Sequence, residues 1–198
     1  GHAYSRAGVA AFTTSTGYGI TKYDNPEELS VSDRNNIGYQ YTDCPLYWIS
    51  VIYLNFAEAK AEMGSLTQDD LNNSINKLQA RAGLPAMTTT PDADPANNMG
   101  VSNLIWEIRR CRRCELIMDN WYRYWDLIRW HQLDKLDSTK YPNTMLGANV
   151  SNVPDCEEAT KNGYIDASDA QIRTYEAKHY FYPIPTTQLT LNKNMKQN

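Results

Sequence analysis

The sequence predicts an all-α protein in which TPR-like helical hairpins are joined by long irregular loops. Apolar residues recur at helical spacing in two paired blocks, at about 46–83 and about 102–136. Capping residues and glycines mark the ends of these blocks. The segments outside them are rich in turn residues.

Length and charge restrict the class of protein. The 198 residues suit one large domain or two small ones. A net charge of −4, from 19 Lys and Arg against 23 Asp and Glu, argues against nucleic acid as a partner. The longest apolar run, 44–56, is interrupted by polar residues and is shorter than the roughly 20 residues of a membrane-spanning helix. The N-terminus lacks signal-peptide regions, so we expect a processed or removed upstream segment.

The first helical pair is expected at about 46–83. Its first helix ends at Gly64. The apolar residues near one face of this helix are Leu46, Ile49, Tyr53, Phe56 and Met63. Thr67 and Asp70 form a capping-box pattern for a second helix, which Gly83 ends. Because the connection is short, the two helices are expected to be antiparallel, as in TPR repeats.

The second helical pair is expected at about 102–136. Ser102 caps a helix that reaches about Met118, and the next helix runs from about Trp121 to Leu136. The joint between them lies near Asp119-Asn120.

The remaining segments are predicted to be loops. Residues 1–45 carry turn signals and are expected to form loop and short strand, while 87–100 is the best internal boundary. The tail, 137–198, is loop-rich: 137–175 is expected to be an ordered surface loop. Prolines exclude a central strand over 180–189, which we expect to be extended.

Opposite charges recur at helical spacing in the second pair. Same-helix pairing is expected for Arg112 with Glu115, for Arg123 with Asp119 and Asp126, and for Arg129 with Asp126. A glycoside hydrolase that uses Glu115, Asp119 or Asp126 is the alternative. Adjacent arginines disfavour it, because they lower the pKa that a general acid needs raised. An ion-pair network that holds two helices is the better interpretation.

The four cysteines do not define a disulfide scaffold or a compartment. Cys111 and Cys114 have the spacing of redox and zinc sites, but Glu115 stands where haem attachment needs histidine. Further zinc ligands would have to come from positions without motif spacing, namely Cys44, Cys156, His131 and His179. We therefore expect two cysteines that fill gaps on a helix face, with no catalytic residue, no metal and no cofactor.

An aromatic cluster follows the joint between the helices. It consists of Trp121, Tyr122, Tyr124, Trp125 and Trp130. Helical spacing favours core packing for Tyr124 and Trp125, and a sugar-stacking face is the alternative. The candidate ligand-binding residues are the aromatics expected to be exposed. They are Trp121 at the joint and Tyr18, Tyr39 and Tyr41 in the N-terminal loop.

Four ordered blocks carry a resemblance. They are GYGITKY at 17–23, LNFAEA at 54–59 with NKLQARAGLP at 76–85, RRCEL at 112–116 with RYWDLIRW at 123–130, and YPIP at 182–185 with QN at 197–198. In this order the blocks resemble the C-terminal region of the SusD/RagB family, glycan-binding outer-membrane lipoproteins of Bacteroidetes. The resemblance covers residues 17–198, and the whole chain, 1–198, is expected to be one SusD-like C-terminal domain.

The resemblance implies a non-catalytic, surface-exposed glycan- or nutrient-binding protein of the outer membrane. It would deliver oligosaccharide to a SusC-like TonB-dependent transporter in polysaccharide utilisation. Membrane attachment would depend on a lipid anchor outside this chain. The alternative is a structural or protein-interaction module that supports the transporter complex without a ligand site of its own. An exposed apolar face over 46–82 is expected, where upstream helices of a longer parent would stack.

The sequence also departs from the family pattern. Trp48 and Val51 stand where the family tends to have Arg and Glu, and Cys111 stands where it usually has Glu. Asp119-Asn120 replaces a usual Glu-Gly. These changes are expected to weaken buried ion pairs and to indicate a divergent branch whose ligand need not be starch.

Overall fold

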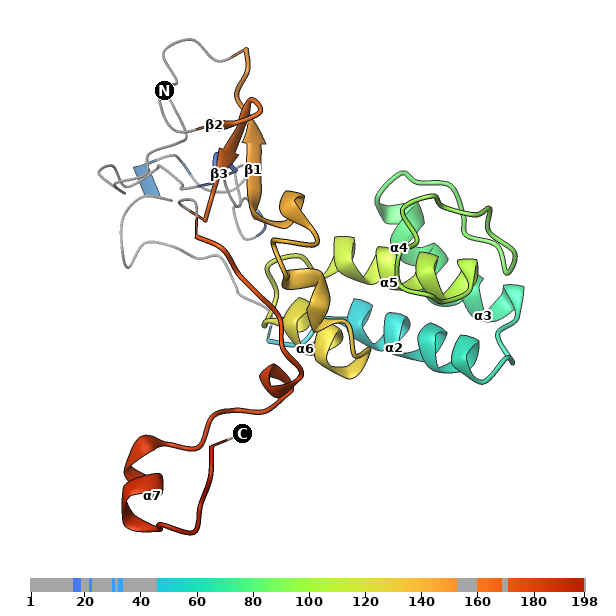
Figure 1. The fold of residues 1–198 in the computed structure, drawn as a ribbon. Coiled ribbons are helices and arrows are strands. Elements are labelled where there is room, and N and C mark those ends of the chain that lie inside the picture. The colour runs from blue at the N-terminus through green and yellow to red at the C-terminus, as the bar shows by residue number, and fades with distance from the viewer. Residues whose placement is uncertain are drawn as a thin grey trace. The chain divides into compact units, whose positions relative to one another are not determined.

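A computed structural model describes residues 16–18, 22, 30, 32–33, 46–152, 160–168 and 171–197 of the chain. The chain divides into two compact units. The helical unit is Cys44–Trp130, and the loop-rich unit combines Gly1–Asp43 with His131–Asn198 (Figure 1). The described residues are mostly helical, which confirms the helical class. None of their helices combines the length and apolar character needed to cross a membrane.

Helix α2 (Ile49–Glu62) packs side by side with α5 (Asn103–Glu115) in the helical unit (Figure 1). Its buried residues are small or polar apart from one leucine, and they are Ser50, Leu54, Ala57 and Glu58. The prediction that the apolar face of this helix packs into the core is wrong, because Leu46, Ile49, Phe56 and Met63 are exposed. Small side chains let the two helices approach closely, whereas the large ones would hold them apart. An exposed apolar face on this segment, which was also expected, is confirmed.

The predicted helix stops at Gly64 and Gly83 are confirmed. Both glycines adopt φ +66°, a left-handed conformation that favours glycine. At the end of α2 the Ser65 amide donates to the Lys60 carbonyl at 2.9 Å. Past Gly83 the Leu84 amide donates to the Gln79 carbonyl, also at 2.9 Å. These are Schellman C-caps, which satisfy carbonyl groups that the helix leaves open.

The helix expected over about 67–83 is two short helices, α3 (Gln68–Asn72) and α4 (Ile75–Arg81). The capping box of Thr67 and Asp70 is confirmed at the start of α3. Ser74 interrupts the run: its backbone has φ −132° and ψ −98°, and its hydroxyl donates to the Asp70 carbonyl at 2.6 Å. A serine hydroxyl that bonds to the backbone competes with the helical ladder.

Ser102 caps α5, as expected, and its hydroxyl accepts the Ile105 amide at 3.3 Å. The helix ends at Glu115, three residues before the expected end at Met118. The prediction of a single helix over 121–136 is wrong. Helix α6 (Tyr122–Arg129) is short, and a 3-10 turn, η1 (Leu133–Leu136), follows in the loop-rich unit. Between them His131 has φ 52°, which no right-handed helix can contain.

The core of the helical unit lies among α2, α3, α4 and α5. Its members are aliphatic apart from one methionine, and they are Leu54, Ala57, Leu71, Ile75, Met87, Ile108 and Leu116. Asn76 joins the connecting segment to this core, since its side chain accepts the Met87 amide at 2.7 Å and donates to the Met87 carbonyl at 3.1 Å. The segment after Gly83 is thereby fixed against α4.

The loop-rich unit contains a small antiparallel sheet in the segment expected to be an ordered surface loop. Its strands are β1 (Leu146–Asn149), β2 (Thr160–Lys161) and β3 (Tyr164–Asp166), in the order β1-β3-β2. A 3-10 turn, η2 (Pro142–Met145), leads into β1. Ile165 is the buried residue of β3. Strands this short leave little periodicity in a sequence. The turn residues around them therefore led to the prediction of a loop.

The C-terminal tail contains helical turns where an extended segment was expected over 180–189. A 3-10 turn, η3 (Ala177–Tyr180), precedes the prolines, and α7 (Thr186–Leu191) follows them. Pro185 is the residue before α7, and proline is well tolerated at a helix start because an amide there needs no helical partner. The prolines therefore end one element and begin another.

Candidate functional site

Trp121 is the most exposed of the tryptophans that the structure describes, with 81% of its surface accessible. It lies at the α5–α6 joint, as the sequence predicts, and Tyr18 in the loop-rich unit is also exposed, at 63%. Tyr39 and Tyr41 lie outside the described residues. Trp125 differs from its expected place in the core, because half of its surface is accessible. Its indole meets the Tyr124 ring edge-on, with centroids 5.5 Å apart.

The joint that carries Trp121 has an unusual backbone. Met118, Asn120 and Trp121 have φ values of 63°, 36° and 58°. Left-handed φ costs about 1–2 kcal/mol at a residue with a Cβ atom. The Asn120 side-chain Nδ2 donates to the Leu46 carbonyl at 3.1 Å, which ties the joint to the residues before α2. Such strain persists where the surrounding structure enforces it, and it is often found at binding sites.

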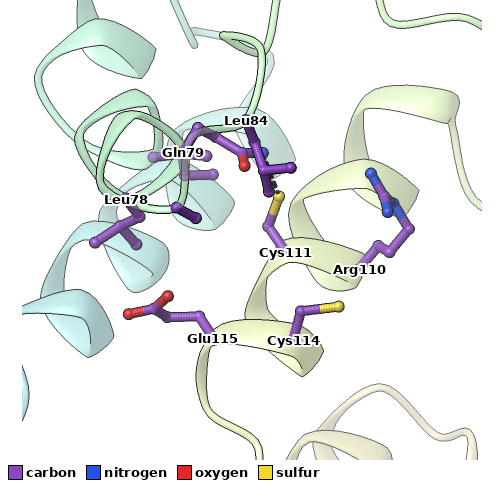
Figure 2. Close-up of a pocket in the computed structure, with 9 residues that line it drawn as sticks. Leu78, Gln79, Leu84, Arg110, Cys111, Cys114 and Glu115 are labelled. Carbon is purple, nitrogen blue, oxygen red and sulfur yellow. Dashed lines mark hydrogen bonds between the residues drawn. The ribbon is translucent and has the colours of Figure 1, made fainter.

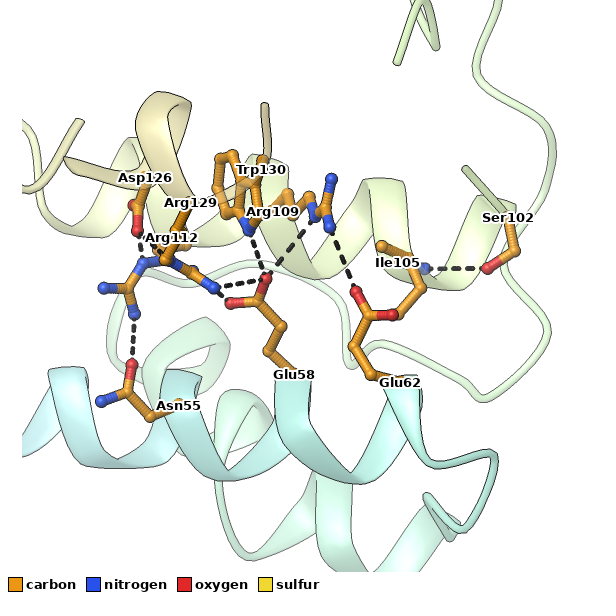
Figure 3. A network of polar contacts seen from close by, with 10 residues as sticks. All are labelled: Asn55, Glu58, Glu62, Ser102, Ile105, Arg109, Arg112, Asp126, Arg129 and Trp130. Carbon is orange, nitrogen blue, oxygen red and sulfur yellow. Dashed lines mark hydrogen bonds and ion pairs between the residues drawn. The ribbon is translucent and has the colours of Figure 1, made fainter. Parts of the chain in front are cut away.

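Helix α6, which begins after Trp121, is held by the buried carboxylate of Glu58 (Figure 3). Arg129 donates to both Glu58 oxygens, at 3.1 and 2.5 Å. Trp130 Nε1 donates to Glu58 Oε1 at 2.6 Å. Arg109 Nε lies 3.5 Å from the same oxygen, and its terminal nitrogen donates to Glu62 at 3.1 Å. One α2 carboxylate thus gathers groups from α5 and from the end of α6.

A second buried carboxylate extends the network, since Asp126 accepts Arg112 Nε at 2.7 Å and Arg129 Nε at 2.8 Å. Arg112 also donates to the Asn55 side chain at 2.7 Å (Figure 3). The expected pair of Arg129 with Asp126 is confirmed. Arg112 pairs with Asp126 rather than with Glu115, and buried ion pairs are present despite the sequence departures that were expected to weaken them. These contacts form the Glu58 network: Asn55, Glu58, Glu62, Arg109, Arg112, Asp126, Arg129 and Trp130.

An open hollow of about 430 Å³ lies over this network. Asn55, Glu58, Glu62, Arg129 and Trp130 are among its lining residues. The Arg109 and Arg129 guanidinium groups both stack on the Trp130 indole, 4.5 and 4.6 Å from its centroid. Because the charged groups of the hollow are already paired with one another, a ligand would have to displace internal ion pairs. The network is therefore suited to anchoring α6 and the Trp121 joint rather than to binding a ligand.

The carboxylates considered for hydrolysis lie in different surroundings. Asp126 is held by two guanidinium groups, and Glu115 accepts Arg81 at 2.7 and 2.6 Å. Both oxygens of each of these two carboxylates already accept a hydrogen bond from an arginine. Asp119 is buried, with 3% of its surface accessible, in the α5–α6 joint.

A second cavity, of about 190 Å³, lies between α4 and α5 and is lined by Cys111 and Cys114 among other residues (Figure 2). Gln79 Nε2 donates to Cys111 Sγ at 3.0 Å. Burial raises the pKa of the Cys111 thiol to about 12, so neighbouring arginines do not activate it. The Cys114 thiol points away from that of Cys111 (Figure 2). The pair therefore does not converge on a metal ion.

The other residues considered for a zinc site are dispersed. His131 lies beside the Tyr180 ring, with centroids 5.2 Å apart, and His179 Nδ1 accepts the Glu176 amide at 3.0 Å. Cys44 and Cys156 lie outside the described residues. Within the stretches that the structure describes, no three His, Cys, Asp or Glu side chains gather as a metal site.

Glu58 was not predicted from the sequence, although two signals indicate it. Residues 109–113 carry more arginines than their own helix has carboxylates, so an arginine without a partner on that helix can pair with a carboxylate on another helix. Glu58 and Glu62 are spaced i, i+4 in an alanine-rich helix, which puts two negative charges on one face. The network joins these two sets.

Comparison with known proteins gives one match. A family model for the SusD family matches residues 2–198, almost the whole chain. No curated protein and no solved structure matches the chain.

Proposed function

The chain belongs to the SusD family, and on that premise we propose that it is a cell-surface glycan- or nutrient-binding protein that delivers oligosaccharide to a SusC-like TonB-dependent transporter. The family match over residues 2–198 is the observation that carries this proposal. The family consists of carbohydrate-binding proteins of the outer-membrane surface. We also propose that the helical hairpins stack as TPR-like repeats.

The proposed role is non-catalytic. Two observations support it: Asp126 and Glu115 are engaged by arginines, and the Glu58 network uses its charges internally. A binding protein needs exposed rings and hydrogen-bonding groups rather than a proton donor. The candidate ligand-contacting residues remain Trp121 and Tyr18, together with Tyr39 and Tyr41.

Trp121 supports glycan binding through its chemistry and its position. The CH groups of a pyranose ring lie well on an aromatic face, and an exposed indole held by a strained joint keeps that face accessible. Ile117 and Met118 of the same joint are exposed as well, at 62% and 66%. The joint thus presents an apolar surface, with an asparagine side chain that fixes its backbone.

Isothermal titration of the full chain against a panel of neutral and acidic oligosaccharides tests the proposal. We expect heat of binding for at least one member and an unchanged oligosaccharide by chromatography afterwards. Replacement of Trp121 by Ala should weaken binding at least about tenfold, as for loss of an aromatic contact in a binding site. Replacement by Phe should retain most of it, and Tyr182→Ala, at another exposed aromatic, is the control. Absence of heat across the panel, or cleavage of any member, would overturn the proposal.

A second candidate role is a protein-interaction module in the transporter complex. The exposed apolar face of α2, which includes Ile49, Ile52, Phe56 and Met63, favours it. Co-purification of the full-length protein with the transporter, compared for wild type and Ile52→Glu/Phe56→Glu, tests this role. Retention of transporter by a protein that binds no glycan would favour the second role over the first.

A further inference from the structure

The hairpin between β2 and β3 contains the only Asn-Gly pair in the sequence, Asn162–Gly163. Because Lys161 pairs with Tyr164, these two residues form the whole turn. Their φ values are 55° and 82°. A two-residue turn with positive φ at both positions is a type I′ turn, for which asparagine followed by glycine is preferred. The backbone of the hairpin therefore accounts for this pair of residues at its tip.

Gly163 lies in close contact with the residues that follow β1. Its carbonyl accepts the Val150 amide at 2.8 Å and the Ser151 hydroxyl at 3.5 Å. A Cβ atom at position 163 would lie 2.0 Å from Ser151 Oγ, and φ 82° is itself a conformation that favours glycine. The fold thus favours a residue without a Cβ atom directly after Asn162, which is exposed.

An asparagine followed by glycine is also chemically reactive. The backbone nitrogen of the second residue attacks the side-chain Cγ of the asparagine, and the new N–C bond closes a succinimide ring. The C–N bond of the side-chain amide breaks, and ammonia leaves with the proton of the backbone nitrogen. Water then opens the ring at either carbonyl, which gives aspartate or isoaspartate. Glycine favours ring closure because it has no Cβ atom to shield the attacking nitrogen.

We propose that Asn162–Gly163 is a site of spontaneous deamidation, and that the product loosens the β1-β3-β2 sheet. Aspartate adds a negative charge to the turn, and isoaspartate in addition routes the backbone through the side-chain methylene. The backbone between Lys161 and Tyr164 is then longer, although their pairing depends on a two-residue turn. The loss of register reaches the next residue, Ile165, which is 1% exposed. This modification consumes only water and does not depend on the proposed function.

The test incubates the full chain at neutral and at mildly alkaline pH and follows each asparagine by peptide mass spectrometry. Asn143 is the internal comparison, since it is also exposed but precedes the β-branched Thr144. We expect Asn162 to convert at least about tenfold faster than Asn143, because a branched side chain hinders the attacking nitrogen. Conversion should be faster at the alkaline pH, where the backbone nitrogen loses its proton more readily. Equal rates at the two asparagines would overturn the site.

A matched variant tests the structural consequence. Asn162→Gly tolerates φ 55° and has no side-chain amide to react. Hydrogen exchange measured before and after incubation should show a loss of protection at the Val150 amide, which bonds to Gly163, in wild type only. Deamidated wild type with full protection of this amide would overturn the loosening of the sheet. Equal losses in wild type and Asn162→Gly would overturn it as well, because the variant cannot deamidate at this position.

Discussion

At the scale of single residues, Glu58 joins three side chains of the polar network through one carboxylate. Its carboxylate accepts from Arg129 and Trp130 and lies beside Arg109, while 4% of its surface is accessible. A buried charge is tolerated when its partners satisfy it, and removal of one partner leaves the others uncompensated. The stabilising effect of this residue therefore depends on several groups from other helices.

Glu58→Gln should lower the free energy of unfolding by about 3 kcal/mol, because it removes the buried carboxylate that Arg109 and Arg129 share and leaves each guanidinium with one carboxylate partner. Urea denaturation followed by circular dichroism measures the change. Glu62→Gln is the matched control on the same helix: its side chain is 53% exposed and contacts only Arg109 within the network. That control should cost less than about 1 kcal/mol. Equal effects of the two substitutions would contradict the central role of Glu58.

At the scale of elements, the α5–α6 joint sets the direction of Trp121. The backbone turns through left-handed residues within a few positions, and α6 starts without a side-chain cap. A tryptophan at such a position is not favoured by local preference. Its place in the joint agrees with a role for the exposed ring, as proposed above.

Comparison of Trp121→Gly with Trp121→Ala isolates the backbone strain. Glycine usually destabilises a protein relative to alanine, but at φ 58° it should be the more stable replacement by about 1 kcal/mol. Chemical denaturation of both variants measures the difference. The same pair at Trp125, inside α6, should show the ordinary order with alanine more stable. An alanine variant at 121 that is the more stable one would show that the joint has no such strain in solution.

In the loop-rich unit, Asp137 connects two distant stretches of chain. Its carboxylate accepts the hydroxyl and amide of Thr139, at 2.5 and 2.9 Å, and the Tyr175 amide at 3.1 Å. The Thr139 hydroxyl, followed by the Tyr175 amide, lowers the pKa of Asp137 from 3.8 to about 2. These hydrogen bonds hold Asp137 and Tyr175, which lie at the two ends of the intervening segment, next to each other.

The lowered pKa fixes the sign of a pH effect. The charged carboxylate stabilises the folded state above pH 3.8, and this contribution is lost as the pH falls towards 2. Wild type should therefore lose stability more steeply than Asp137→Asn between these values. Thermal unfolding in a pH series measures both slopes, with Asp134→Asn as the control at a nearby acidic residue. Parallel slopes for wild type and Asp137→Asn would contradict the assignment.

At the scale of the whole molecule, an acidic chain contains a local excess of positive charge. The net charge is −4, yet residues 109–113 hold four arginines. Those of the Glu58 network are neutralised internally. This distribution excludes a general basic surface.

Several structural features were predictable because their causes are local. Gly64, Gly83 and the Ser102 cap act within one turn of the backbone, and Trp121 is exposed because it lies in a joint. The buried face of α2 was not predictable in the same way. Large apolar residues normally mark the core face, but here the close packing of α5 selects Leu54 with small neighbours.

The sequence by itself determined the helix stops at Gly64 and Gly83, the Ser102 cap, the mostly helical class and the family, since these depend on short motifs in a fixed order. Only the tertiary structure decided which charges meet. Arg129 reaches Glu58 across 71 positions of sequence, and Arg112 takes Asp126 instead of its helix neighbour Glu115. The spacing rule for helix pairs applies within one helix. The choice among partners on different helices depends on packing distances, which exist only once the helices have docked.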